Sequence, residues 1–224
     1  MLDSDLSLKA HVSQLTARCY SCLRRVKSCR CALTRITAAT VVISLIVTRL
    51  DYCNRLLAGY TKQTLDKLQR VLNCSARVIF GGDSRLHVTP LTTRAPYNVR
   101  CSYPVRWKQL VSKVETHCSH WLRARERILF TVCLLVYQTI HGLAPWYLIV
   151  MFIPASTVPN LSALRSAARG DLVVPRKRLQ LGSRTFSVAG PVASRSLPLD
   201  IRSASTLSAF KNMLKTSFLT FLLY

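Results

Sequence analysis

The segment from residue 61 to residue 79 has the clearest two-faced pattern in the chain, and it strongly limits what the chain can fold into. Its apolar residues recur at spacings of three and four, which places them in one sector of an α-helix; they are Leu65, Leu68, Leu72, Ala76 and Ile79. Lys67, Arg70 and Arg77 fall on the opposite side. Thr61 is a suitable N-cap, and Gly81-Gly82 is expected to end the helix. The segment predicts an amphipathic helix with a core face and a basic face.

Two further helices are expected before this one. From residue 8 to residue 26 the apolar residues recur with the same spacing, and basic residues occupy much of the remaining surface. That surface could lie on nucleic acid or on a membrane, or it could be an ordinary solvated face, which we favour. Residues 37–50 are also apolar at helical spacing, although their many β-branched side chains leave a strand open for part of the segment.

The second half of the chain predicts two helices and one hairpin. Residues 128–140 form an apolar helical pattern closed by Gly142 and Pro145, and we expect this helix to lie in the core. Residues 172–175 and 185–188 flank the basic run Arg176-Lys177-Arg178, and we interpret them as the arms of a β-hairpin. Ser205 or Thr206 is expected to cap a last helix, whose apolar side holds Leu207, Phe210, Leu214, Phe218 and Phe221.

These patterns predict a mainly α protein with a small C-terminal β-hairpin. Residues 83–119 differ from the rest, because their prolines and aromatic residues follow no sustained period. We therefore predict three parts: a helical segment at 1–82, an irregular insertion or linker at 83–119, and a helix, hairpin and helix at 120–224.

The charge of the chain is strongly positive. Its 32 Lys and Arg residues against 9 Asp and Glu residues give a formal net charge of +23. A field of this size attracts phosphate polymers before any specific contact forms. We therefore expect non-specific binding of RNA or DNA. The predicted nucleic-acid-binding residues are Lys67, Arg70 and Arg77 of the amphipathic helix and the run Arg176, Lys177 and Arg178.

The nine cysteines indicate reduced thiols. Their number is odd, their spacing is irregular, and the acidic opening Met1-Leu2-Asp3-Ser4-Asp5 lacks the basic start of a signal peptide. An intracellular protein, nuclear or cytoplasmic and not secreted, is therefore expected. Three sets of residues could bind a metal by type: Cys19-x-x-Cys22, Cys29-x-Cys31 and the trio His117, Cys118 and His120. None has a usual ligand spacing, so neither a metal nor a cofactor is predicted.

Neither membrane insertion nor catalysis is expected. The apolar segment 36–47 is too short to span a bilayer, and the longer segment 128–154 is interrupted by polar residues, glycine and proline. Polymerase chemistry needs clustered carboxylates to hold two metal ions, but no two acidic residues are adjacent in this chain. A Gly-rich phosphate loop and a Gly-x-Ser-x-Gly motif are also absent from the sequence.

Three blocks of sequence together resemble the region that follows the catalytic palm in LINE-type (non-LTR) retrotransposon reverse transcriptases. The first block runs from Arg49-Leu50-Asp51-Tyr52-Cys53-Asn54 through Leu68-Gln69-Arg70-Val71 to Ala76-Arg77-Val78. The second comprises His120-Trp121-Leu122, Arg125-Glu126-Arg127-Ile128-Leu129-Phe130 and His141-Gly142-Leu143-Ala144-Pro145-Trp146-Tyr147-Leu148. The third comprises Leu172-Val173-Val174-Pro175, Phe186-Ser187-Val188-Ala189-Gly190-Pro191 and Ser196-Leu197-Pro198-Leu199-Asp200-Ile201-Arg202, and it ends in Phe210-Lys211.

The resemblance implies a helical thumb-like or connection-like segment that helps to hold template RNA, primer and target DNA. The palm with its Asp-Asp motif and the endonuclease would lie upstream, so the chain is expected to be a non-catalytic fragment. Two alternatives stay open. The chain could be a helical module that binds a protein partner through apolar helix faces, or a translated transposon relic, incompletely folded and without a selected function.

Overall fold

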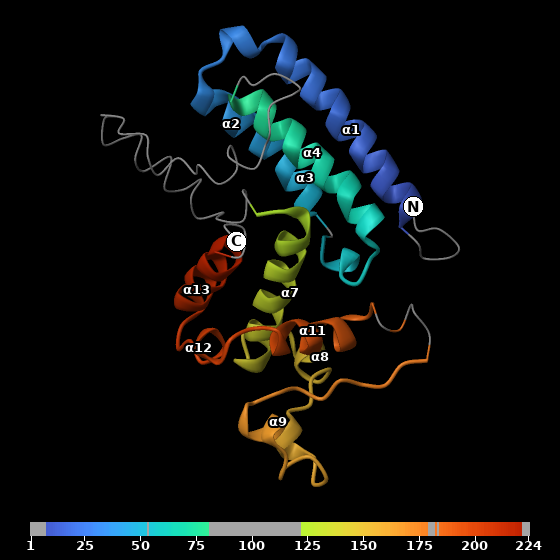
Figure 1. Ribbon diagram of the computed structural model, residues 1–224, viewed down its shortest axis with the longest axis vertical. Coiled ribbons are helices and arrows are strands. Elements are labelled where there is room, and N and C mark those ends of the chain that lie inside the picture. Colours follow the sequence, from blue (N-terminus) through green and yellow to red (C-terminus); the bar gives the residue numbers. More distant parts are fainter. Residues whose placement is uncertain (1–7, 53, 81–121, 179–181, 183, 221–224) are drawn as a thin grey trace. The chain divides into compact units, whose positions relative to one another are not determined.

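The computed structural model describes residues 8–52, 54–80, 122–178, 182 and 184–220. In these residues the chain is mainly helical, which confirms the predicted fold class at this level (Figure 1). Contacts divide the chain into two compact units. The described part of unit 1 comprises residues 8–52, 61–80 and 122–127, and that of unit 2 comprises 54–60 and the described residues from 128 to 220. The predicted boundaries near 82 and 119 lie outside the described residues and stay a prediction.

The described part of unit 1 contains three long helical segments. They are α1 (Lys9–Ser28); the continuous run of α2 (Arg35–Val42), the π-helical turn η2 (Ile43–Val47) and α3 (Thr48–Asp51); and α4 (Lys62–Phe80), with a short turn η1 (Arg30–Ala32) after α1. Residues 37–50, for part of which the sequence also allows a strand, are helical throughout. The side chain of Thr34 starts this run by accepting a hydrogen bond from the Thr37 amide at 3.2 Å.

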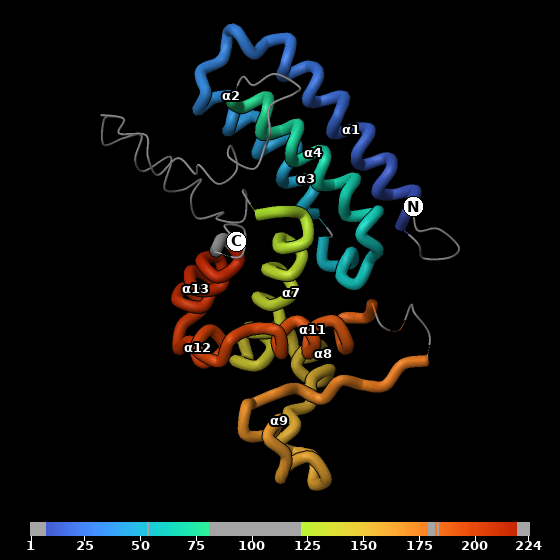
Figure 2. Tube along the Cα trace, viewed as in Figure 1, coloured from blue at the N-terminus to red at the C-terminus, as the bar shows by residue number. Residues whose placement is uncertain are grey.

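The three segments pack as a bundle because each buries one apolar stripe. On α1 the buried residues are Val12, Thr16, Cys19, Leu23 and Val26, at the spacing that the sequence predicts. On α4 they include Leu68, Val71, Ala76 and Ile79. α1 and α4 lie side by side and run in the same direction, while the α2–α3 run returns in the opposite direction (Figure 2).

Unit 2 is built around α7 (Ala124–Ile140), of which residues from Ile128 onward belong to this unit. Its other helices and helical turns are η3 (Asn54–Leu57), α8 (Trp146–Ile149), η5 (Ala155–Thr157), α9 (Arg165–Ala168), α11 (Phe186–Arg195), α12 (Leu199–Arg202) and α13 (Leu207–Thr220). Most of α7 is buried, as its uniformly apolar sequence predicts.

The C-terminal end of α7 and the N-terminal end of α13 follow familiar capping rules. Gly142 has a φ of +70°, and the Leu143 amide after it donates to the Gln138 carbonyl at 2.8 Å, which closes α7 as a Schellman motif. Thr206 caps α13, because its hydroxyl accepts a hydrogen bond from the Ala209 amide at 3.2 Å. The predicted end of α7 and the predicted start of the last helix are therefore confirmed.

The aromatic core of unit 2 joins α7 to α13. The rings of Tyr137 and Phe210 stack with their centroids 4.3 Å apart. The Tyr137 hydroxyl donates to the Ala204 carbonyl at 2.8 Å, so its polar end is satisfied although the side chain is buried.

The predicted C-terminal β-hairpin does not form. The second arm, residues 185–188, is instead the start of α11, which begins at Phe186. The first arm makes an isolated antiparallel bridge between Leu172 and Pro154. Four residues are too few to distinguish a strand from the first turn of a helix, and this run opens α11, which approaches its neighbours closely through Gly190. A Cβ atom added there would lie 2.7 Å from Cζ of Phe152 and 3.0 Å from Cγ2 of Val136 on α7.

Some predictions fall outside the described residues. These are the helix end at Gly81-Gly82, the trio His117, Cys118 and His120, and the position of Phe221. Among the residues that are described, six cysteines are free thiols. No helix in the described part is long and apolar enough to cross a membrane.

Candidate nucleic-acid interface

The candidate interface lies along the line where α1 and α4 pack against each other, which we call the seam. Arg30, just after α1, fixes the end of this seam by donating from Nε to the Val78 carbonyl at 2.8 Å and from Nη2 to the Ile79 carbonyl at 2.9 Å. These are among the last carbonyls of α4, which have no partner within the helix, so Arg30 caps α4 from the neighbouring segment. The two helices are therefore held in parallel at their C-terminal ends.

Tyr20 lies on α1 at the middle of the seam, and its side chain is half-buried. Burial raises the pKa of its phenol, the Cys74 thiol adds to that rise, and the Arg70 guanidinium opposes it. The phenol of Tyr20 on α1 therefore lies within electrostatic range of Cys74 and Arg70 on α4. Arg70 is itself exposed, so this edge of the seam faces solvent.

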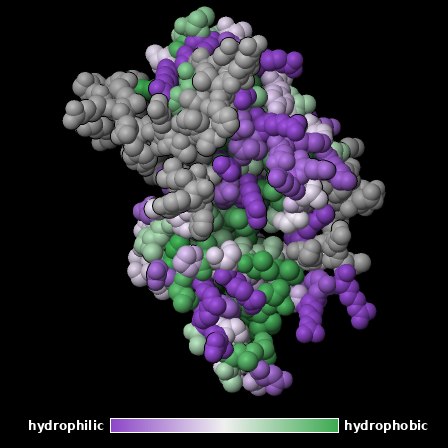
Figure 3. Space-filling view, viewed as in Figure 1, coloured by the Kyte–Doolittle hydropathy of each residue, from purple (hydrophilic) through white to green (hydrophobic). Residues whose placement is uncertain are grey.

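Exposed cations from both helices share this edge. Lys67 and Arg70 lie one turn apart on α4, and both are exposed. On α1, Arg24 and Lys27 are exposed and lie within about 40° of Tyr20 at 100° per residue. We call the surface formed by Tyr20, Arg24, Lys27, Lys67 and Arg70 the seam face. Figure 3 shows hydrophilic side chains gathered over α1 and α4.

The two helices that carry the seam face have little acidic charge of their own. α1 contains no Asp or Glu, and α4 contains one acidic residue, Asp66, which is half-buried. Sequence reasoning identified Lys67 and Arg70 but did not assign Arg24 and Lys27 to the site. The missing signal was the parallel pairing of α1 with α4, which brings two separate basic patterns onto one surface.

The other predicted residues are placed differently. Arg77 is half-buried on α4, so it presents less of its charge to a ligand than Lys67 or Arg70 does. Arg176, Lys177 and Arg178 are all exposed in unit 2. They follow an extended segment, not a hairpin arm, in which the Val173 amide donates to the Ile153 carbonyl at 2.8 Å. The structure thus brings Lys67 and Arg70 together and leaves the run as a separate basic segment.

Two arginines, Arg35 and Arg184, already make cation–π contacts within the protein. The Arg35 guanidinium lies 4.1 Å from the ring centroid of Phe80 in unit 1, and that of Arg184 lies 4.3 Å from the ring centroid of Tyr60 in unit 2. These cation–π contacts contribute to packing, so we leave both arginines out of the interface.

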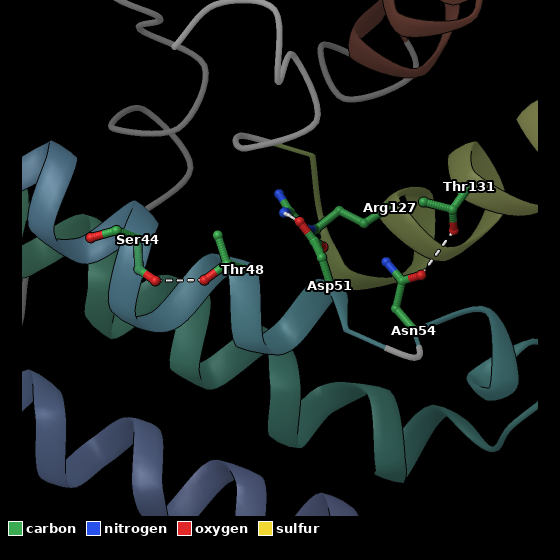
Figure 4. A network of polar contacts seen from close by, with 6 residues as sticks. All are labelled: Ser44, Thr48, Asp51, Asn54, Arg127 and Thr131. Carbon is green, nitrogen blue, oxygen red and sulfur yellow. Dashed lines mark hydrogen bonds and ion pairs between the residues drawn. The ribbon is translucent and has the colours of Figure 1, made fainter.

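Sequence reasoning also missed a buried ion pair in unit 1. Arg127, at the start of α7, donates from Nε to Oδ1 of Asp51 at 3.0 Å and from Nη2 to Oδ2 at 2.5 Å (Figure 4). The Arg127 side chain is 2% exposed and that of Asp51 is 29% exposed. Within unit 2, the Thr131 hydroxyl donates to Oδ1 of Asn54 at 3.0 Å. Asp51 and Asn54 belong to the first block of the resemblance, and their partners are on the helix that carries the second.

Two of the described cysteine thiols are buried. Burial is the largest cause raising the pKa of the Cys19 thiol to about 11 and that of Cys133 to about 12. Both thiols therefore stay protonated near neutral pH and are poor nucleophiles and metal ligands. In the part of the chain that the structure covers, no three His, Cys, Asp or Glu side chains lie together where they could hold a metal ion.

No family model, curated protein or solved structure matches this chain. The resemblance to LINE-type reverse transcriptases therefore rests on the sequence blocks alone.

Proposed function

We propose that this chain binds RNA or DNA non-specifically, without catalysis, and that the seam face of unit 1 is the main contact. The observation that carries the proposal is the set of four exposed cations, Arg24, Lys27, Lys67 and Arg70, on one edge of two parallel helices. Phosphate groups along a nucleic-acid strand repeat every few ångströms, so a row of cations along a helix seam can neutralise several of them at once.

The exposed run Arg176, Lys177 and Arg178 is proposed as a second, independent contact from unit 2. Three adjacent exposed cations can follow a phosphate backbone without a fixed secondary structure. The resemblance supports the same function, because a thumb-like segment behind a polymerase palm would hold template and primer. Because no base-reading arrangement is part of this proposal, we expect dissociation constants of about 10⁻⁴ to 10⁻⁶ M at physiological salt.

The salt dependence of binding tests the seam face. Each lost phosphate contact should reduce the slope of log K against log salt by about 0.9 on duplex DNA and about 0.7 on single strands. The pair Lys67→Gln and Arg70→Gln should therefore flatten the slope by about 1.4 to 1.8. Fluorescence anisotropy with labelled oligonucleotides of unrelated sequence gives the slope directly.

α1 provides a matched control. Arg18 and Arg25 are exposed cations, but they lie about 150° away from Tyr20 around the helix axis. The pair Arg18→Gln and Arg25→Gln removes the same charge and should leave the slope nearly unchanged. If both pairs flatten the slope equally, the chain binds through its net charge of +23 and the seam face is not a site. The triple change of Arg176, Lys177 and Arg178 to Gln tests the second contact in the same assay.

A protein-binding module remains the second candidate function, and one observation favours it. Unit 2 leaves Trp146 and Val150 more than two-thirds exposed, and large apolar side chains in such positions often mark contacts with another protein. Under this alternative, a partner would bind with defined stoichiometry and with little sensitivity to salt. A chain without cooperative unfolding would instead support the third possibility, a relic without a selected function.

A further inference from the structure

Unit 2 exposes several large apolar side chains between the end of α7 and the segment after α8. We call this set the apolar patch; its members are Leu143, Trp146, Tyr147, Val150, Met151 and Ile153. Trp146 is 76% exposed and Val150 is 72% exposed. The Val150 amide donates to the Trp146 carbonyl at 3.1 Å, so the two residues are one helical turn apart and share a side.

The patch also lies in a stretch without charge. Residues 128–164 contain no Lys, Arg, Asp or Glu, although the chain has 32 basic and 9 acidic residues. Figure 3 shows apolar side chains gathered over the α8 and α11 part of unit 2. Nucleic acid would find no cation within this stretch to bind its phosphates. The occupant that suits the patch is therefore another apolar, uncharged surface.

We propose that the apolar patch binds the same patch of a second copy of this chain, forming a two-fold symmetric dimer. Elsewhere two copies with a net charge of +23 would bring like charges together, whereas the segment 128–164 that carries the patch contains no charged residue of its own. In a two-fold interface the same residues meet from both sides, and an uncharged apolar surface is complementary to itself.

The size and composition of the patch suit a dimer interface. A standard interface buries on the order of 800 Å² on each partner, and six large apolar side chains exposed by about 40% to 76% provide area of this order. Exposed Trp and Tyr side chains side by side are typical of the residues that dominate binding energy. The rings of Trp146 and Tyr147 lie 6.3 Å apart in an edge-on arrangement, so they present one combined surface.

The dimer has a distinctive dependence on salt. Salt screens the repulsion between the two cationic chains, because the Debye length falls from about 10 Å at 0.1 M to about 3 Å at 1 M. Dimerisation should therefore strengthen as salt rises. Binding to nucleic acid, to an anionic membrane or to an acidic protein should weaken instead. Failure of this test therefore leaves the proposed nucleic-acid function untouched, and the reverse also holds.

Sedimentation equilibrium of the full chain, freed of nucleic acid by nuclease and high-salt washing, tests the proposal. The expected result is a monomer–dimer equilibrium whose dissociation constant decreases between about 0.1 M and about 1 M salt. Trp146→Ser should weaken dimerisation at least about thirtyfold, as for a central interface residue. Tyr52→Ser is the matched control, because Tyr52 is 75% exposed in unit 1, and it should have no effect.

Four results would overturn the proposal: a monomer at both salt concentrations, association that weakens with salt, equal effects of Trp146→Ser and Tyr52→Ser, or assemblies that grow without limit. Both substituted residues are exposed, so their variants should retain the helical circular dichroism of the parent chain. Val150→Ser provides a second test of the same contact if Trp146→Ser alters the fold. The salt dependence of the parent chain needs no variant.

Discussion

Substituting Asp51 by Asn should destabilise unit 1 through its effect on Arg127. The Arg127 guanidinium is almost completely buried, and both carboxylate oxygens of Asp51 accept hydrogen bonds from it. Asn keeps the shape of Asp but carries no charge and only one acceptor oxygen. The substitution therefore removes the negative charge that faces a buried guanidinium, which is more unfavourable than the loss of an exposed ion pair.

The magnitude follows from the exposure of the two side chains. Breaking a fully buried ion pair typically costs about 3–5 kcal/mol. Because Asp51 is 29% exposed, water can partly solvate the charge that remains, and we expect a loss of about 2–3 kcal/mol in the free energy of unfolding. An exposed acidic residue such as Asp200 provides the control, since Asp200→Asn should change stability by less than about 0.5 kcal/mol.

Urea denaturation followed by circular dichroism measures these changes, and a double-mutant cycle isolates the pair. Arg127→Met removes the buried charge, so in its background Asp51→Asn should cost much less than in the parent chain. We expect a coupling free energy of at least about 1 kcal/mol. If Asp51→Asn stays within about 0.5 kcal/mol of the parent, or if the two changes are additive, the ion pair does not stabilise unit 1 as argued.

Two further predictions concern packing and titration in the helices. Gly190→Ala should reduce stability by about 1–3 kcal/mol in a urea titration, because its Cβ would lie 2.7 Å from Phe152; unchanged stability would show that α11 can shift. The raised pKa values of Cys19 and Cys133 (about 11 and about 12, from 9.0) mean that the unfolded chain loses these protons first as pH rises. Stability should therefore fall above about pH 9, by up to about 1.4 kcal/mol per pH unit for each thiol, and Cys133→Ala should reduce that dependence. An equally steep dependence in Cys133→Ala would exclude this thiol as its source.

Local sequence determined the principal helices because each buries one stripe of side chains at helical spacing. Much of the stripes of α1, α4, α7 and α13 could be predicted, and so could the Thr206 cap and the glycine end of α7. On α4, however, the predicted Leu65 and Leu72 are half-buried, and Val71 is buried instead. These features depend on residues no more than a few positions apart, so the sequence contains all the information they need. The exposure of Lys67 and Arg70 followed from the same periodicity, because they lie opposite the buried stripe of α4.

Only the tertiary structure decided the features that join distant residues. Residues 185–188 are too few for their pattern to distinguish a strand from the first turn of a helix. In the structure they begin α11, and Gly190 of this helix packs closely against Val136 and Phe152. The pairing of Asp51 with Arg127 spans 76 positions, and the seam face exists because α1 packs in parallel against α4. Such contacts depend on which surfaces meet when the chain folds, and no local period encodes that choice.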